Sequence, residues 1–227
     1  MSKYKPHVYS IRTLTNLHVG GTGDSFSIVD KQVQRDVTTR HPTIFSSGLK
    51  GALRDHFDDV LTNNKDAVIQ HIFGSEPNNS GQPRQGKYRF LNADILVLPE
   101  PGGDSLYRPI TSSCSLKNFR DKIALLGGTL ANDFFNGWKP DDQIFAELAT
   151  ELPVIARNHL DDGGISQNLW YEEVVPREAV FGFAVLVPDG DNYFDIFNQN
   201  IDGKVIQIGA NATVGYGLCL FTKISQP

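Results

Sequence analysis

Residues 16–54, NLHVGGTGDSFSIVDKQVQRDVTTRHPTIFSSGLKGALR, decide the fold of this chain. The stretch begins with a glycine-rich loop, passes an acidic residue at Asp30 and a basic residue at Arg35, and ends where a helix is expected to start. No other segment gathers so many charged, small and chemically reactive residues. We therefore expect the functional surface of the protein to form around this span.

The end of this stretch predicts an amphipathic helix. Leu49, Leu53 and Phe57 recur every four residues, and an apolar pair at 60–61 continues the row. Serines stand just before the row, and a serine side chain can cap the free N–H groups of a first helical turn. We therefore expect a helix that begins near Ser46.

The same helix start suggests a phosphate site. Lys50 and Arg54 lie beside the apolar row, and free amides, the positive end of the helix dipole and two cations together favour phosphate. The simpler interpretation is a capped surface helix whose lysine and arginine are solvated, because charges on a polar helix face are common. Both interpretations stay open at this point.

Composition limits the class of protein. The 227 residues are enough for one elaborated domain. The net charge is −5, yet residues 1–54 carry eight lysines and arginines against three aspartates, so a basic face on an acidic body is compatible with a polyanion. Two distant cysteines, Cys114 and Cys219, favour a reducing compartment. No apolar run reaches membrane length and no signal-peptide core is present, so we expect a cytoplasmic protein without a membrane partner.

Hydrophobic patterning indicates an α+β fold. Strands are expected at 7–15, 90–99, 180–187 and 218–224, and helices at 67–73 and 116–126, the latter capped by Ser115. Residues 24–40 look irregular apart from a short extended piece at 28–29, residues 78–86 look like a loop, and residues 127–142 have no clear pattern. We expect a ferredoxin-like (RRM-like) antiparallel sheet, which is a common platform for single-stranded RNA.

A hairpin is predicted in the second half of the chain. Two extended pieces, 154–160 and 168–174, flank the turn-forming residues 161–164, DDGG. The whole chain is therefore expected to be a single domain, with residues 152–176 inserted as a hairpin.

Several motifs resemble one known family. LHVGG, VDKQVQRD and SSGLKGALR, in this order, are similar to the N-terminal pattern of the RAMP superfamily of CRISPR proteins. IFGSEP (72–77), NLWYEEVVP (168–176) and IQIGANATVGYG (206–217) resemble the repeated backbone subunit of the type III-B (Cmr) effector. The type III-A (Csm) backbone subunit is the second candidate, and the last two segments favour the Cmr type. One departure is Lys31-Gln32, where the family usually has Leu-Pro.

The resemblance implies a palm that polymerises with copies of itself along a CRISPR guide RNA and joins other type III effector subunits. The hairpin at 152–176 would be a thumb that interrupts pairing between guide and target RNA. Asp30 would be the catalytic residue and would hold a divalent metal, Mg²⁺ or Mn²⁺. The RNA contacts that we predict fall on His18, Arg35, Ser46, Ser47, Lys50, Arg54, Arg157, Trp170 and Gly215.

The chemistry needs only one carboxylate. RNA cleavage by its own 2′-hydroxyl requires an in-line geometry that an A-form duplex forbids, so a base must leave the stack. A carboxylate can then orient or deprotonate the 2′-hydroxyl or hold a metal at the phosphate, giving a 2′,3′-cyclic phosphate and a 5′-hydroxyl. Mg²⁺ typically takes only one or two protein carboxylates.

Other side chains compete for these roles. Asp24 and Asp36 lie in the same loop as Asp30, and we expect Asp36 to pair with a neighbouring arginine. His18 is a weaker candidate for a general acid. Glu172 and Glu173 are adjacent in a predicted strand and should face opposite sides, so we expect them at the base of the hairpin or at a subunit contact.

Three rival functions make different demands on the sequence. A non-cleaving filament subunit would bind guide RNA without cutting its target. A standalone guide-processing endoribonuclease would normally need a histidine-centred acid–base set, which the sequence does not offer. An unrelated RRM-type module is disfavoured because the aromatic strand motif of that class is missing.

Overall fold

The computed structural model describes residues 3–21, 29–75, 84–102, 104–131 and 133–225. The strands are β1 (Tyr4–Thr13), β2 (Thr43–Ile44), β3 (Arg89–Phe90), β4 (Ala93–Pro101), β5 (Tyr107–Thr111), β6 (Lys139–Pro140), β7 (Val154–Leu160), β8 (Ser166–Glu173), β9 (Val180–Pro188), β10 (Val205–Gln207) and β11 (Leu218–Lys223). The helices are α1 (Ser46–Val60), α2 (Lys65–Ile72), α3 (Ser113–Leu125), α4 (Asp142–Thr150) and α5 (Phe194–Ile201), with a 3₁₀ turn at Ala212–Val214.

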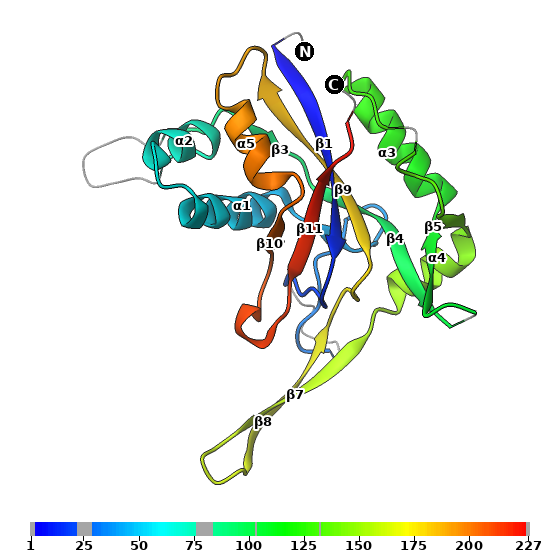
Figure 1. Cartoon of the computed structure of the whole chain (residues 1–227). Helices are drawn as coiled ribbons and strands as arrows, with labels where there is room; N and C mark the ends of the chain where they lie inside the picture. Colours follow the sequence, from blue (N-terminus) through cyan, green and yellow to red (C-terminus); the bar gives the residue numbers. More distant parts are fainter. Residues whose placement is uncertain (1–2, 22–28, 76–83, 103, 132, 226–227) are drawn as a thin grey trace.

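One large sheet forms the body of the protein, in the order β10-β11-β1-β9-β4-β5-β6 (Figure 1). Its strand pairs are antiparallel except for β5 and β6. The long strand β1 lies between β9 and β11, and Tyr9 is paired with Phe183 on one side and Lys223 on the other. Helices cover both faces of this sheet, and the fold is α+β, as the patterning predicted.

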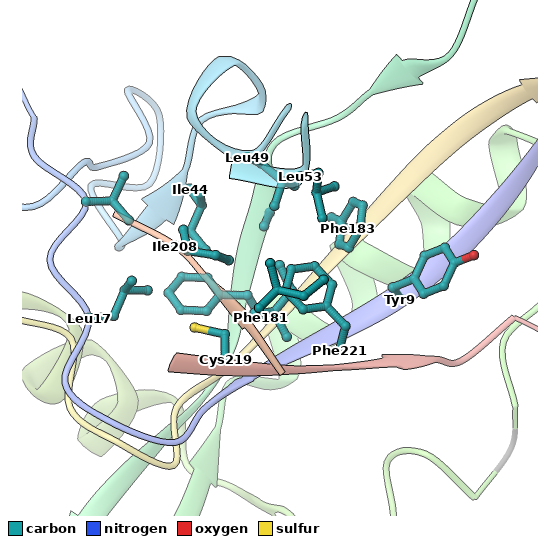
Figure 2. Close-up of a cluster of buried hydrophobic side chains, with 14 of the residues drawn as sticks. Tyr9, Leu17, Ile44, Leu49, Leu53, Phe181, Phe183, Ile208, Cys219 and Phe221 are labelled. Carbon is teal, nitrogen blue, oxygen red and sulfur yellow. The ribbon is translucent and has the colours of Figure 1, made fainter. Parts of the chain in front are cut away.

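The alternation along β1 separates two apolar cores. Tyr9 and Ile11 point to one face, where they pack in a cluster that includes Leu49 and Leu53 of α1 (Figure 2). Val8 points to the other face and belongs to the smaller cluster around α3. Because successive side chains of a strand face opposite sides, β1 anchors both helical layers at once.

A close contact between β9 and α3 explains a glycine in the middle of a strand. A Cβ atom at Gly182 would lie 2.6 Å from Cζ of Phe119 and 2.7 Å from Cδ1 of Leu96. We expect Gly182→Ala to lower the free energy of unfolding by about 1–3 kcal/mol, because both neighbours are buried in a packed core. The measurement is urea unfolding of the purified protein.

Gly51 provides the matched control. A Cβ at Gly51, on the exposed side of α1, meets no atom within 4 Å. Gly51→Ala should therefore raise the free energy of unfolding by about 0.5–1 kcal/mol, because alanine costs less backbone entropy in a helix. A Gly182→Ala protein as stable as the wild type would contradict the proposed tight packing of α3 on β9.

Strand β1 contains a histidine, His7, whose protonation opposes folding. The ring of His7 stacks on Phe194 with centroids 3.7 Å apart. Burial, with smaller contributions from Lys223 and Lys5, lowers the pKa of His7 to about 4. The unfolded chain binds a proton at His7 near pH 6.5, whereas the folded chain does not. Stability should therefore fall as pH falls from about 6.5 towards 4.

This pH effect can be isolated by substitution. His7→Phe keeps an aromatic ring against Phe194 but has no group that titrates. We expect the loss of unfolding free energy between pH 6.5 and 4 to be smaller in His7→Phe than in the wild type, as measured by urea unfolding at a series of pH values. Equal losses in the two proteins would contradict a neutral His7 in the folded state.

The hairpin of β7 and β8 forms a separate two-stranded sheet, and it projects from the body of the protein (Figure 1). Both strands were predicted, although β8 begins two residues earlier than expected. Along the hairpin, Leu160, Ile165 and Leu169 are all more than half exposed. The projecting part of the hairpin therefore has no apolar core of its own.

Several details differ from the sequence prediction. Helix α3 begins earlier than expected, and its cap is Ser112, whose Oγ accepts the amide of Ser115 at 3.2 Å. Helices α4 and α5 were not predicted; α4 follows β6, which lies in the unassigned segment 127–142. The predictions for residue 28 and for residues 78–83 lie outside the described residues. Within the described part of the chain, no helix is long and apolar enough to cross a membrane.

Candidate functional site

Main-chain hydrogen bonds join distant segments where the hairpin meets the sheet. The amide of Leu17 donates to Val175 O at 2.9 Å, and the amide of Val175 donates back to Leu17 O at 2.8 Å. The amide of Ala210 donates to His18 O at 2.9 Å, which holds the C-terminal glycine turn, residues 209–217, against the same segment. Gly20 bridges to Val33 in the loop that follows Asp30. We call this meeting point the hairpin junction, residues 17–21, 30–35, 172–175 and 209–217.

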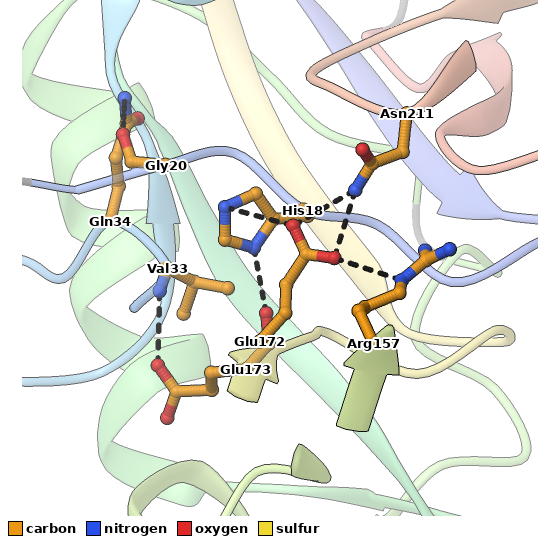
Figure 3. A network of polar contacts seen from close by, with 8 residues as sticks. All are labelled: His18, Gly20, Val33, Gln34, Arg157, Glu172, Glu173 and Asn211. Atoms are coloured by element: carbon orange, nitrogen blue, oxygen red, sulfur yellow. Dashed lines mark hydrogen bonds and ion pairs between the residues drawn. The ribbon is translucent and has the colours of Figure 1, made fainter. Parts of the chain in front are cut away.

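A buried carboxylate lies at the centre of the junction. Glu172 is 1% exposed, and its oxygens accept hydrogen bonds from Nδ2 of Asn211 at 2.9 and 3.0 Å and from Nε of Arg157 at 3.2 Å (Figure 3). Nε2 of His18 lies 3.6 Å from the same carboxylate. Glu172 therefore ties the hairpin to the glycine turn and to the loop after β1.

The His18 ring is enclosed by this network. Its side chain is buried, and Nδ1 lies 2.7 Å from Glu173 O while Nε2 faces Glu172. With both ring nitrogens engaged inside the protein, the predicted RNA contact through this side chain does not fit its environment. His18 instead fixes the hairpin to the loop that follows β1.

Glu173 faces the opposite side of β8, as expected for neighbours in a strand. Its carboxylate accepts the amide of Val33 at 3.0 Å and lies 2.5 Å from Nη2 of Arg35. Arg35 also donates to the carbonyl oxygens of Ala149 and Arg40, at 2.6 and 2.9 Å. The Arg35 guanidinium is thus occupied by internal partners, so the predicted phosphate contact is not supported by its position.

Asp30 is exposed at the edge of the hairpin. Its Oδ2 accepts the main-chain N–H of Tyr171 at 2.7 Å. The next residue, Lys31, donates its amide to Tyr171 O at 3.1 Å and accepts the amide of Glu173 at 2.9 Å. The loop therefore adds a short parallel bridge to the outer edge of β8. No hydrogen bond to Oδ1 of Asp30 occurs among the described residues.

The start of α1 differs from the capping prediction. The helix begins at Ser46, so the capping position belongs to Phe45, which has no side-chain oxygen. The amide of Phe45 instead donates to Oε1 of Gln34 at 2.7 Å, and that of Ser46 donates to Oδ1 of Asn92 at 2.8 Å. Ser47 is exposed in the first turn. The helix start thus offers an open surface next to the junction.

The two cations of α1 have different environments. Nη1 of Arg54 donates to Gly74 O at 2.9 Å, so this side chain links α1 to the end of α2, and the predicted phosphate contact is not supported by its position. Lys50 is half-buried and has no ion pair within the described part of the chain. A built Cβ at Gly48 would lie 3.9 Å from Cγ1 of Val19, which places the helix start against the loop after β1. Lys50 is the cation of this helix that remains available to a phosphate.

The remaining predicted residues line the hairpin and the glycine turn. The guanidinium of Arg157 lies over the ring of Tyr216 at 4.4 Å, and Nζ of Lys31 lies over the ring of Trp170 at 5.0 Å. Nη2 of Arg157 and Nε1 of Trp170 are buried and have no hydrogen-bond partners in the described part of the chain. Gly215 is exposed in the left-handed region, with φ 81°.

The other acidic candidates do not join Asp30. Among the described residues, the Asp36 carboxylate forms no ion pair with an arginine, contrary to prediction; its Oδ1 accepts the amides of Thr38 and Thr39 at 2.9 and 2.8 Å. The pKa of the Asp36 carboxyl is lowered, chiefly by the hydrogen bond that it accepts from the Thr39 main-chain N–H. Asp24 lies outside the described residues. In the part of the chain that the structure describes, no three acidic, histidine or cysteine side chains gather as a metal site.

A model of the RAMP superfamily matches residues 10–220. The chain belongs to this superfamily. The CRISPR system Cmr endoribonuclease Cmr4 of Pyrococcus furiosus is 26% identical over an alignment 287 positions long, gaps included, which covers 97% of this chain and 95% of the relative. The Cms endoribonuclease Csm3 of Methanothermobacter thermautotrophicus is 25% identical, with 92% and 80% covered.

Solved structures have the same fold as this RAMP protein. A chain of the type III-B Cmr-beta complex bound to cognate target RNA matches with a TM-score of 0.77 at 20% identity, covering 97% of this chain and 98% of that one. A chain of oligomeric Cmr4 from Pyrococcus furiosus matches with a TM-score of 0.70 at 20% identity, covering 98% and 99%. The recognition of the superfamily from sequence motifs is confirmed.

Sequence reasoning missed parts of the site that act through the main chain or through single amides. Asn211 was not singled out, although asparagine is typical where the backbone is left-handed, and here its φ is 65°. Gln34 and Asn92 accept amides at the start of α1, and no local pattern connects them to it. The Tyr171 amide could not have been found, because a backbone donor leaves no sequence signal.

Proposed function

We propose that this RAMP protein is a repeated backbone subunit of a type III CRISPR effector that binds guide RNA and cleaves complementary target RNA. Copies of the chain would line the guide, together with other subunits of the effector. The relatives support this proposal through their names, since one is a Cmr endoribonuclease and one matched chain belongs to a complex with target RNA. The observation that carries it is the exposed carboxylate of Asp30 at the edge of the hairpin.

A ferredoxin-like palm is part of the proposal. Strands β1, β4, β9 and β11 alternate with α1 and α5 in the chain, and they lie in the order β11-β1-β9-β4. Every neighbouring pair among these four is antiparallel, which is the arrangement of a β-α-β-β-α-β unit. On this view the segment from β5 to β8 is one insertion between the second and third core strands. It carries the hairpin that would act as the thumb.

The guide strand would lie across the start of α1 and the glycine turn. Ser46 and Ser47 with Lys50 offer a helix N-terminus and a cation, and Gly215 lets a backbone approach closely. Arg157 and Trp170 would meet RNA only after the hairpin side chains rearrange, because their free donors are buried. These contacts are mostly sequence-independent, as a subunit that accepts any guide requires.

Cleavage would depend on Asp30 and on the thumb. The hairpin would separate one base from the guide–target duplex, which brings the 2′-hydroxyl of the target into line with the scissile phosphate. Asp30 would accept the proton of that hydroxyl or orient it. Its carboxylate is exposed, unlike those of Glu172 and Glu173, and would hold Mg²⁺ or Mn²⁺, which would neutralise charge on the phosphate. The 2′-oxygen would bond to phosphorus as the P–O5′ bond breaks, and the leaving 5′-oxygen would take a proton from water, which gives a 2′,3′-cyclic phosphate and a 5′-hydroxyl.

The proposal is tested on the assembled particle. RNA that co-purifies with the protein should have uniform length, and an end-labelled complementary RNA should be cut at regular intervals with cyclic phosphate ends. Bound RNA of uniform length without any cutting would identify a non-cleaving filament subunit. Cutting of repeat RNA by the isolated chain would instead identify a guide-processing nuclease.

A further inference from the structure

We infer that the outer edge of β8 positions Asp30, so that the hairpin and the catalytic loop move as one unit. This inference rests on the proposed function, because it assigns positioning residues to the cleavage reaction. It adds the main-chain amide of Tyr171 and the side chain of Glu173 as groups that act on the RNA only through Asp30.

The first contact fixes the carboxylate itself. The Tyr171 amide donates to Oδ2 of Asp30 at 2.7 Å, and the amide of Lys31 donates to Tyr171 O at 3.1 Å. The main-chain N–H and C=O of Tyr171 therefore both point away from β7, although Tyr171 lies opposite Ala156 in the hairpin. In an antiparallel ladder such a residue belongs to a non-hydrogen-bonded pair. Its amide is thus free to orient Asp30 without any cost to the hairpin.

The second contact fixes the chain that follows. The amide of Glu173 donates to Lys31 O at 2.9 Å, and the Glu173 carboxylate accepts the amide of Val33 at 3.0 Å and pairs with Arg35. Glu173 is 8% exposed, so these bonds are shielded from competing water. Residues 30–35 are consequently fastened to the end of β8 at three successive points. A movement of the hairpin would be passed on to Asp30.

The consequence concerns the order of events in cleavage. A target strand that displaces the hairpin would shift the carboxylate together with it, so Asp30 would reach its working position only when the target is seated. Misplacing a reacting group by about 1 Å can cost about 10²-fold in rate. The edge of β8 would therefore couple target docking to cutting.

Comparing proline with alanine at position 171 distinguishes the role of the main-chain amide from that of the tyrosine side chain. Tyr171→Pro removes the donor to Asp30 but no bond between β7 and β8. We expect single-turnover cleavage by the assembled particle to fall by about 10²-fold relative to Tyr171→Ala, with unchanged binding of target RNA. Leu169→Pro is the matched control, because Leu169 lies two residues earlier, has the same orientation, and donates no hydrogen bond to another segment among the described residues.

Hydrogen exchange on the full-length chain tests the coupling without any cleavage. The Tyr171 amide should exchange slowly in the wild type and faster in Asp30→Ala. Glu173→Ala should also speed exchange at Val33, and Glu173→Gln, which keeps an acceptor, should restore most of the protection. Equal cleavage by Tyr171→Pro and Tyr171→Ala, or no change in exchange, would overturn the inference and leave the proposed function intact. Absence of cleavage in the wild-type particle would overturn both.

Discussion

Replacing Asp30 by asparagine should slow target cleavage by about 10²- to 10⁴-fold. Asparagine keeps an oxygen that can accept the Tyr171 amide, so the loop should stay in place. It removes the negative charge, and with it the ability to accept a proton or to hold a metal tightly. Single-turnover cleavage of end-labelled target by assembled particles measures the effect, and guide and target binding should be unchanged.

Asp36 provides the control for this experiment. It lies in the same loop region, but its carboxylate caps its own turn through Thr38 and Thr39. Particles that carry Asp36→Asn should therefore cleave target RNA at the wild-type rate. Normal cutting by Asp30→Asn, or a large loss in Asp36→Asn alone, would show that the catalytic carboxylate has been assigned to the wrong residue.

The parts of the fold that could be predicted from the sequence are those in which apolar residues recur with a regular spacing. Leu49, Leu53 and Phe57 repeat every four residues, and α1 buries all three. The hairpin was predicted because 161–164 has turn chemistry between two extended pieces. Helix α4 escaped prediction because it is short and most of its residues are partly exposed. Local patterns report which face is buried, and short elements carry too few residues to form one.

The site was harder to predict than the fold. Arg35 and Arg54 had the right residue type for phosphate, but both guanidinium groups are used by carbonyl oxygens inside the protein. These partners lie far away in the sequence, since Ala149 is 114 positions from Arg35. Lys50, in contrast, keeps its charge available. Residue type indicated the class of ligand, whereas tertiary contacts decided which cations remain free to bind it.

The chemistry of the hairpin junction also separates stability from catalysis. Asp30 is exposed and has one main-chain partner, whereas Glu172 is buried and has several side-chain partners. An exposed carboxylate such as Asp30 lowers the free energy of unfolding little even with few partners, and it can act on a substrate. A buried one is held by its partners, so its removal should affect the free energy of unfolding before it affects any reaction.

Glu172→Ala should lower the free energy of unfolding by about 3–5 kcal/mol. The substitution leaves the partly buried Nε of Arg157 without its carboxylate, and the buried Nη2 of the same guanidinium has no hydrogen-bond partner among the described residues. Asn211 would lose its acceptor as well, and His18 would lose the carboxylate that lies 3.6 Å from its Nε2. Urea unfolding of the full-length protein measures the loss, and a Glu172→Ala protein within about 1 kcal/mol of the wild type would contradict it.

A double substitution distinguishes an unpaired charge from a lost packing contact. In Arg157→Met with Glu172→Leu, neither charge of this pair remains, so much of the lost stability should return. If the double variant is instead as unstable as Glu172→Ala, packing around Asn211 and His18 dominates the effect. Hydrogen exchange should rise first at residues 154–173 in Glu172→Ala, because this carboxylate joins the hairpin to the glycine turn. Uniform loosening of the whole sheet would mean that the hairpin junction stabilises the palm as well as the thumb.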